Sequence, residues 1–340
     1  MKKVLAGFFA MVMVLSLCVT AQAAKTYNIK IAHMLSETDD THQGYLALKK
    51  MLEERSKGQF KVQIFPSAAL GATDDEHAEL VNTNSVQVAL CGFFSLPNIH
   101  KDLAYWAVLD LPFLFQSDAE YYAFLNSDYG KELCADVLKK TGNILINTVF
   151  VRSWHCLTTT KTPVRVPADM KGLKTLTSSP RIFQSTVRAW GGNVTAIPFA
   201  ETYTAMQQGG VDANLRAINL HVSQRFYEVQ KHFTLVNPFA MSVTSLISNS
   251  FVESLPADLK EIFLTSLKDY EKIMQKYGET RQAESIKQLE GFGLQKIVLT
   301  PEEKQQWIDA SKPVYDEMAP IIGKDVIAKA QAIIDSVRKK

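Results

Sequence analysis

The segment from Pro163 to Asn219 decides the fold that we predict for this chain. It opens with Pro163-Val164-Arg165-Val166-Pro167-Ala168-Asp169-Met170-Lys171-Gly172-Leu173-Lys174 and continues through Ser178-Ser179-Pro180, Gly191-Gly192-Asn193 and Ile197-Pro198-Phe199. It closes with Glu201-Thr202-Tyr203-Thr204-Ala205-Met206-Gln207-Gln208-Gly209-Gly210-Val211-Asp212-Ala213-Asn214-Leu215-Arg216. Each motif alone is a weak signal, but their order within one segment is specific.

The start of the chain has the pattern of a secretory signal peptide. Lys2 and Lys3 precede an apolar run over 4–19, and Ala21-Gln22-Ala23 is a small-x-small cleavage site. A membrane anchor is the alternative, but the apolar run is short for crossing a bilayer. A lipoprotein would need a small residue before Cys18, where the chain has Leu17. We therefore expect export and a mature chain that begins at Ala24.

The remaining composition indicates a soluble globular protein. The chain has 340 residues, long enough for two domains, and 46% of them are hydrophobic. Loss of Lys2 and Lys3 leaves 35 basic against 35 acidic residues, so no excess charge points to nucleic acid or anionic membrane. The mature chain keeps Cys91, Cys134 and Cys156, an odd number with no metal-binding spacing, which we interpret as small buried residues.

Alternating strand and helix patterns predict an α/β fold. Strands are expected over 27–32, 60–65 and 85–90, with helices over 45–56 and from Thr73 to about Asn82; Leu46, Leu48, Met51 and Leu52 are expected on the inner side of the first helix. Ligands in such sheets collect at the carboxyl ends of strands. This rule places His33-Met34 and 91–94 near a pocket, although Phe93 and Phe94 suit an ordinary core equally well.

The second half of the chain predicts a crossing strand and a long helix. The segment 147–160 is expected to cross into a second lobe, with a return strand over 234–249. One helical segment covers 259–289, with Phe263, Leu267, Tyr270, Met274 and Tyr277 on one side and Gly291-Phe292-Gly293 at its end. Thr300 followed by Pro301 marks the start of another helix.

The ordered motifs of 163–219, together with Pro66-Ser67-Ala68-Ala69-Leu70-Gly71 and Asp110-Leu111-Pro112-Phe113-Leu114-Phe115, resemble the substrate-binding proteins of TRAP transporters, the DctP type. The resemblance covers nearly the whole mature chain. It implies a two-lobe periplasmic-binding-protein-like fold with a long helix spanning both lobes. We expect a signal peptide over 1–23, lobe I over 24–152 with a return segment at about 242–280, and lobe II over 153–241 with a C-terminal segment at about 281–340.

The chain departs from the family pattern at the ligand site. In the family, an arginine follows the G-L-K motif and clamps the ligand carboxylate, and a second arginine often lies about twenty residues upstream. Leu176 and Cys156 stand at these places here. An asparagine that lines the family's pocket is replaced by Arg216. We hypothesise that Arg216 has taken over the anion contact, because a guanidinium offers a fixed fork of donors; the alternative is that it points to solvent.

Several further residues are candidates for the pocket, each with a structural alternative. Phe199 stands where the family places an aromatic ring against the ligand, and it would also suit a core. Arg152, Trp154 and His155 cluster near the crossing, where strand alternation puts Arg152 and Trp154 on one face as an anion donor and an apolar wall, or in structural roles. Asn214 and Asn219 suit a ligand hydroxyl or a turn. Arg181 is a weaker candidate on a surface helix.

These residues predict a receptor rather than an enzyme. The sequence contains no G-x-S-x-G, H-E-x-x-H, P-loop or G-x-G-x-x-G pattern, and Asp39-Asp40 and Asp74-Asp75 stand where helix starts need caps. The missing arginines favour a small anion, first a short sulfonate such as isethionate and second a monocarboxylate. By the resemblance, its partners are the small and large permease subunits, and no cofactor, metal or nucleic acid is expected. An exported hydrolase is the alternative of another class.

Overall fold

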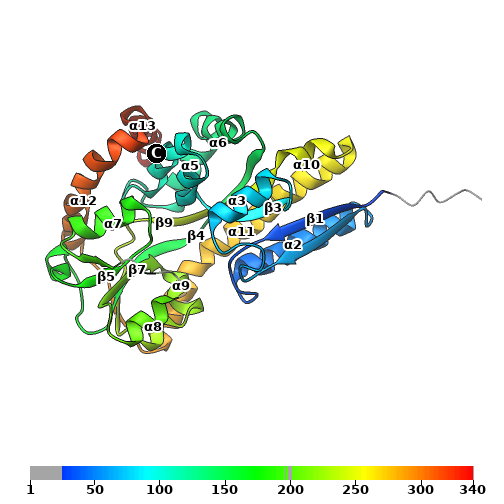
Figure 1. Ribbon diagram of the computed structural model, residues 1–340. Helices are drawn as coiled ribbons and strands as arrows, with labels where there is room; N and C mark the ends of the chain where they lie inside the picture. The colour runs from blue at the N-terminus through cyan, green and yellow to red at the C-terminus, as the bar shows by residue number, and fades with distance from the viewer. Residues whose placement is uncertain (1–24, 196, 198–200, 340) are drawn as a thin grey trace, which may run out of the picture.

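A continuous β-sheet connects the two lobes of the protein (Figure 1). The computed structural model describes residues 25–195, 197 and 201–339. Its strands run in the order β2-β1-β3-β9-β4-β7-β5-β6, with β8 between β4 and β10. Their bounds are β1 Tyr27–Ala32, β2 Phe60–Phe65, β3 Val88–Gly92, β4 Ile144–Thr159, β5 Lys174–Leu176, β6 Asn193–Thr195, β7 Ala213–Ala217, β8 His232–Thr234, β9 Ala240–Ser248 and β10 Gln295–Ile297.

Helices cover both faces of this sheet. The α-helices are α2 Asp40–Arg55, α3 Asp74–Asn82, α4 Leu96–Ile99, α5 Asp118–Asn126, α6 Asp128–Thr141, α7 Arg181–Ala189, α8 Thr202–Gln207, α9 Ile218–Ser223, α10 Asn249–Ser254, α11 Ala257–Gly291, α12 Pro301–Ile322 and α13 Lys324–Arg338. Short 3₁₀ segments are η1 Phe93–Ser95, η2 Lys101–Asp110, η3 Pro167–Met170 and η5 Phe226–Glu228. Within the described residues, no helix has both the length and the apolar character that a membrane crossing requires.

Strand β4 belongs to both lobes. Its first part pairs with β9 up to Trp154, and its last part pairs with β7 from His155 onward. We call the strands β2-β1-β3-β9 with residues 144–154 lobe I, and β7-β5-β6 with β8, β10 and residues 155–159 lobe II. The predicted crossing strand is confirmed, and the domain boundaries proposed from the sequence remain a prediction.

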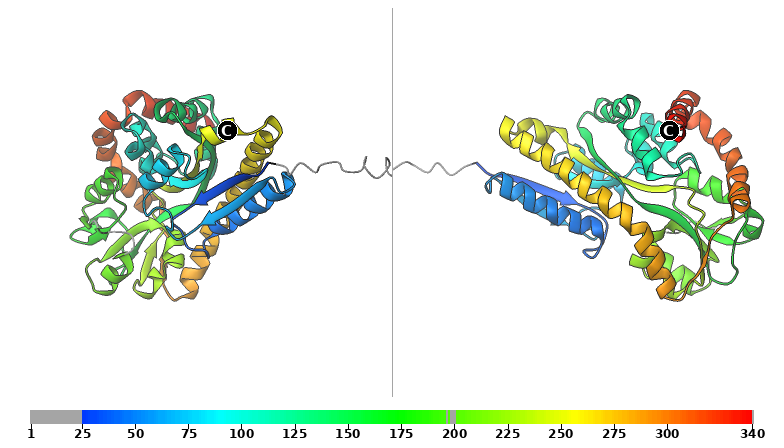
Figure 2. Two further views of the ribbon diagram at one scale, coloured as in Figure 1. Left: turned by 45° about the vertical axis from the view of Figure 1, so that its right-hand side comes forward. Right: turned by 180° about the vertical axis from the view of Figure 1, so that it is seen from behind.

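Helix α11 is the second element shared by the lobes. It is 35 residues long and runs diagonally across the back of the molecule, from lobe I to lobe II (Figure 2). In lobe I it packs on α2, where the rings of Tyr45 and Tyr270 stack with centroids 4.9 Å apart. In lobe II it packs on α9. The two-lobe α/β architecture with a spanning helix is therefore as predicted.

Local sequence signals placed most elements correctly. The alternation in 27–32 buries Ile29 and Ile31 in β1, because successive side chains of a strand point to opposite faces. Thr73 caps α3 by accepting a hydrogen bond from the backbone N–H of Glu76, and Thr300 with Glu303 forms a capping box at the start of α12.

Four predictions need correction. Helix α2 begins five residues before the expected Tyr45, because Asp39 caps it by accepting from the N–H of Thr41. Leu46, expected on the inner side of its helix, is exposed, and so is Tyr277, which was grouped with residues of α11 that are buried. The predicted strand over 234–249 is split into the end of β8 and β9, because Asn237 has a left-handed backbone conformation and Pro238 follows it. Strand β3 begins at Val88 instead of Ser85.

Candidate functional site

Three neighbouring strands of lobe II carry several of the candidate residues on one face. Leu176 of β5 is in register with Asn214 of β7, which pairs with Thr158 of β4. Two residues further along, Arg216 pairs with Cys156. Since paired residues share a face and alternate residues return to it, these side chains form two rows on the same side of the sheet. The row with Arg216 lies at the carboxyl ends of the parallel strands β5 and β7, where ligands of α/β sheets bind.

Arg216 is buried rather than turned to solvent. Its side chain is 8% exposed, and its Nη1 donates to the hydroxyl of Ser178 at 3.3 Å. Burial lowers the pKa of the guanidinium to about 10, so the side chain stays cationic at neutral pH. The structure therefore holds a positive charge inside lobe II, beside the Ser178-Ser179-Pro180 segment.

Two buried histidines lie near this charge. His155 stacks on Phe183 with centroids 5.7 Å apart, and His221 contacts the hydroxyl of Thr158 through Nδ1 at 3.4 Å. Burial lowers the pKa of each imidazole to about 3, and the charge of Arg216 adds to the shift in both. Both rings are neutral at pH 7 and offer hydrogen bonds without charge.

The buried histidines predict a loss of stability in mild acid. In lobe I, burial also lowers the pKa of His33 to about 4. These folded-state values lie below the usual value of 6.5, so the unfolded chain takes up protons first as the pH falls. Each such group lowers the free energy of unfolding by about 1.4 kcal/mol per pH unit below pH 6.5. Asp110, whose pKa burial raises to about 8, has the opposite sign and offsets one of the three.

A His155→Phe variant isolates one of these contributions, because phenylalanine keeps the stacked ring and cannot take up a proton. Urea unfolding from pH 8 to pH 4.5 should give curves that run parallel above pH 7. Below pH 6.5 the wild-type curve should fall more steeply, by about 1.4 kcal/mol per pH unit. Parallel curves over the whole range would show that His155 is protonated equally in both states.

Leu176 and Cys156, at the places of the family's two arginines, are fully buried. Leu176 packs with Met206, Val211 and Phe226, while Cys156 packs with residues of β8 and α11. Burial raises the pKa of the Cys156 thiol, so it is not a thiolate at neutral pH. All three cysteines of the described chain are free, and Cys134 is half-buried instead of buried as predicted.

The candidates at the crossing do not join this face. Arg152 forms a buried ion pair with Asp39, with Nη2 and Oδ2 2.6 Å apart, while the indole of Trp154 donates to Asp118 on α5. The expected shared face is wrong because the register with β9 shifts between Val151 and Ser153, a β-bulge that breaks the alternation.

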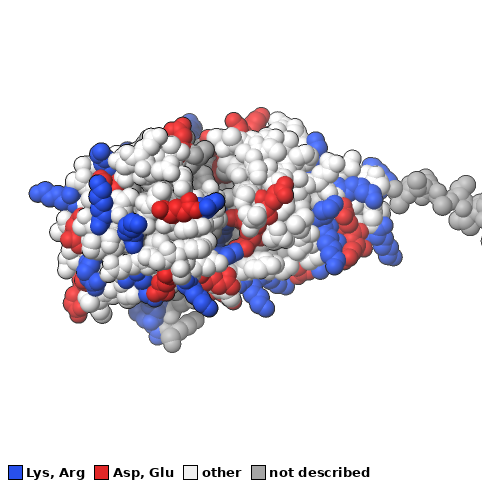
Figure 3. Space-filling view, turned by 90° about the horizontal axis from the view of Figure 1, so that it is seen from below, with Lys and Arg blue, Asp and Glu red and all other residues white. Residues whose placement is uncertain are grey.

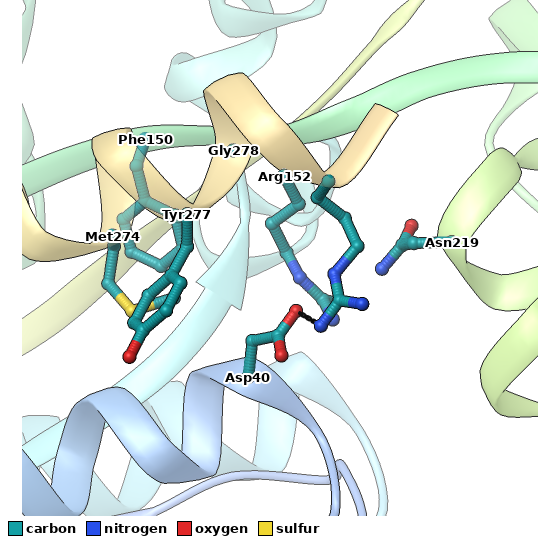
Figure 4. A pocket seen from close by; sticks show the side chains of 8 residues that line it. Asp40, Phe150, Arg152, Asn219, Met274, Tyr277 and Gly278 are labelled. Carbon is teal, nitrogen blue, oxygen red and sulfur yellow. Dashed lines mark ion pairs between the residues drawn. The ribbon is translucent and has the colours of Figure 1, made fainter. Parts of the chain in front are cut away.

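Arg152 belongs instead to a small pocket where α2, β4, α9 and α11 meet (Figure 4). Asp40 from the first turn of α2 forms an ion pair with Arg281 of α11 there. Asn219 of α9 lies at the edge of the pocket and accepts a hydrogen bond from Ser153 at 2.7 Å. These contacts join lobe I to the crossing elements, and the ion pair with Asp39 gives Arg152 a structural role among them.

The aromatic candidates divide in the same way. Phe93 is buried against Trp106, with centroids 4.9 Å apart, which is the core alternative. Its neighbour Phe94 packs edge to face against Phe183 of α7, with ring centroids 6.2 Å apart, so Phe94 is the residue that contacts lobe II. Phe199 lies outside the described residues.

Seen from below, a depression divides the surface, and acidic and basic side chains gather along it (Figure 3).

The site contains residues that the sequence analysis did not select. Thr158 of β4 contacts His221 of α9, and Ser178, in the loop after β5, contacts Arg216. Asn214 and Asn219 are not turn residues, because they lie in β7 and α9. Arg181 is exposed and pairs with Glu317 at 2.7 Å. In the described chain, no cluster of three or more His, Cys, Asp or Glu could hold a metal ion.

Comparison with known proteins agrees with this architecture. The family model DctP, described as "Bacterial extracellular solute-binding protein, family 7", matches residues 31–320. The chain belongs to this family of TRAP solute-binding proteins. The C4-dicarboxylate-binding periplasmic protein DctP of Vibrio cholerae is 30% identical over 89% of this chain and 90% of its own length.

Two further proteins are similar to this chain over most of their length. The 2,3-diketo-L-gulonate-binding periplasmic protein YiaO of Escherichia coli is 25% identical over 83% of this chain and 84% of its own length. A TRAP periplasmic solute binding protein from Shewanella oneidensis with bound succinate is 27% identical, with a TM-score of 0.83 over 91% of this chain and 99% of that one. The family consists of binding proteins of TRAP transporters, which confirms the receptor and periplasmic predictions.

Proposed function

We propose that this TRAP receptor binds a small organic anion through Arg216, with a short sulfonate such as isethionate as its ligand. The observation that supports the proposal is the exchange on one sheet face. The family's arginine place is occupied by buried Leu176, while a buried cation stands at Arg216. A buried guanidinium at the carboxyl ends of β5 and β7 suits an anionic ligand, because it presents a fixed fork of N–H donors to carboxylate or sulfonate oxygens.

The head group follows from the donors around Arg216. A guanidinium presents several N–H groups in one plane, and the hydroxyl of Ser178 lies 3.3 Å from one of its nitrogens. A sulfonate has three oxygens, so it can accept from the guanidinium fork and from a neutral donor together. The second carboxylate of a dicarboxylate would need a second cation in the site. Arg152 does not provide it, because it is already paired with Asp39.

A monocarboxylate is the second candidate for the ligand. The relative from Shewanella oneidensis holds succinate, and the relatives from Vibrio cholerae and Escherichia coli are named for carboxylate ligands. A carboxylate forms two parallel hydrogen bonds with a guanidinium, so Arg216 alone suits one carboxylate group.

In the proposed mechanism, the lobes close on the ligand and the closed form docks on the small and large subunits of a TRAP permease. Closure is a hinge motion about the shared elements β4 and α11. It removes water from the ion pair, which strengthens the interaction of the anion with Arg216. No bond of the ligand changes, so it should be recovered intact, whereas an exported hydrolase would convert it.

Thermal unfolding with isethionate, taurine, lactate and succinate tests this function. A ligand present at 100 times its Kd stabilises the folded state by about 2.7 kcal/mol. We expect isethionate to raise the melting temperature at the lowest concentration of the four. Stabilisation by lactate alone would replace the sulfonate with a monocarboxylate, and stabilisation by succinate alone would reject the proposal.

A further inference from the structure

Two buried polar side chains beside Arg216 carry atoms that have no hydrogen-bond partner among the described residues. Asn214 is fully buried, and neither its amide nitrogen nor its amide oxygen has a partner among the described residues. His221 is also fully buried, and within the same part of the chain its Nε2 has no partner. An unsatisfied polar group in a protein interior costs about 1–3 kcal/mol, so three such atoms near one charge indicate that something else binds there.

Thr158 links the two residues. Thr158 pairs with Asn214 across the strands β4 and β7, and its hydroxyl lies 3.3 Å from the Asn214 carbonyl oxygen and 3.4 Å from His221 Nδ1. Cross-strand pairs hold their Cβ atoms about 5 Å apart on one face. Thr158 therefore positions the imidazole next to the Asn214 amide.

The hydrogen bonds of Thr158 also define what His221 offers. A hydroxyl has one proton, and that of Thr158 is donated to the backbone oxygen of Asn214. Its contact with His221 then requires Nδ1–H as the donor, which leaves Nε2 as an acceptor. Asn214 adds an amide N–H donor and a carbonyl acceptor. The pair thus presents both a donor and acceptors.

We infer that Asn214 and His221 form a second subsite that holds a hydroxyl group of the ligand. A hydroxyl both donates and accepts, so it can accept from Asn214 Nδ2 and donate to His221 Nε2. An ammonium group only donates, and its charge would be repelled by Arg216. The inference rests on the proposed anion contact and specifies the other end of the ligand.

The spacing of the two subsites suits a short ligand. Asn214 and Arg216 are two residues apart on one strand, so their attachment points lie about 7 Å apart. Their side chains project from the same face of the sheet. A chain of two carbons between the acidic head group and the hydroxyl fits this separation.

Paired ligands that differ only in the hydroxyl provide the test. Calorimetric titration would compare isethionate with ethanesulfonate, and 3-hydroxypropionate with propionate. We expect the hydroxylated member of the better-bound pair to bind at least 10-fold more tightly, because its partner leaves buried donors and acceptors unsatisfied. The choice between the pairs tests the head group proposed above, and the ratio within a pair tests the hydroxyl subsite.

Variants of Asn214 and His221 test whether these two residues are responsible for the preference for the hydroxylated ligand. Asn214→Leu and His221→Phe should each lower the affinity for the hydroxylated ligand at least 10-fold and change that for its partner less than 3-fold. Asn193→Leu is the matched control, because Asn193 is exposed on β6 of the same lobe, and it should leave both affinities unchanged. Thermal unfolding of each variant checks that it is folded.

Three results would overturn the inference. Equal affinities of the wild type for the two members of both pairs would show that the protein does not recognise the hydroxyl group. A loss of affinity in Asn214→Leu that is the same for both members of a pair would give Asn214 a packing role only. Preferential binding of taurine over isethionate would show that the subsite takes an ammonium group.

Discussion

Replacing Arg216 by glutamine should lower the affinity for the anion by about 30-fold to several thousand-fold. Breaking a buried, hydrogen-bonded charge pair costs about 2–5 kcal/mol, and each 1.4 kcal/mol is a factor of ten in Kd. Arg216→Lys keeps the charge but loses the planar fork, so its affinity should fall between those of the wild type and the glutamine variant. Calorimetric titration with isethionate measures both.

Arg181→Gln is the control for this prediction. Arg181 belongs to the same lobe, but its side chain is exposed and its ion pair with Glu317 lies at the surface, where such pairs contribute about 0–1 kcal/mol. Its affinity for the anion should stay within 2-fold of the wild type. Thermal unfolding of the ligand-free variants checks that each of them is folded. Retention of affinity by Arg216→Gln would refute the anion contact.

Replacing Gly278 by alanine should destabilise the protein by about 3 kcal/mol or more. Gly278 lies inside α11 where that helix crosses β4, and an added Cβ would stand 2.0 Å from the carbonyl oxygen of Val151. The clash would be with a backbone atom of β4, so no flexible side chain can move to relieve it. The helix must shift from the strand, which disrupts packing in both lobes, and chemical unfolding would measure the loss.

Gly291→Ala provides a control in the same helix. Gly291 is the last residue of α11, and an added Cβ would meet nothing within 4 Å. Alanine has the higher helix propensity, so this change should be neutral or stabilise by a few tenths of a kcal/mol. Equal melting temperatures for the two variants would mean that α11 does not depend on close contact with β4.

Local patterns in the sequence were sufficient for most of the fold. Strand alternation located β1 and β2, and cap residues located the starts of α3 and α12. The predicted boundaries were wrong where one or two residues determine them, as with the Asp39 cap of α2 and the Asn237-Pro238 break before β9. The motifs of 163–219 were sufficient to select Arg216, Leu176 and Asn214.

The remainder of the site depends on contacts between distant segments. Thr158 and His221 meet because β4 pairs with β7 in one particular antiparallel register, which no short motif encodes. The bulge at Arg152 depends equally on the pairing of β4 with β9, so periodicity alone put Arg152 and Trp154 on one face. A histidine shortly after a strand's carboxyl end was the one signal for His221 in the sequence.

The passage of β4 through both sheets limits how the molecule can open. Its ladder of backbone hydrogen bonds continues from β9 to β7 without a flexible loop between them. Separating the halves must therefore bend this strand, and the bulge at Arg152 lies next to the point where β4 changes its pairing partner. Lengthening surface loops elsewhere should leave the opening angle unchanged, and stiffening the bulge should narrow it.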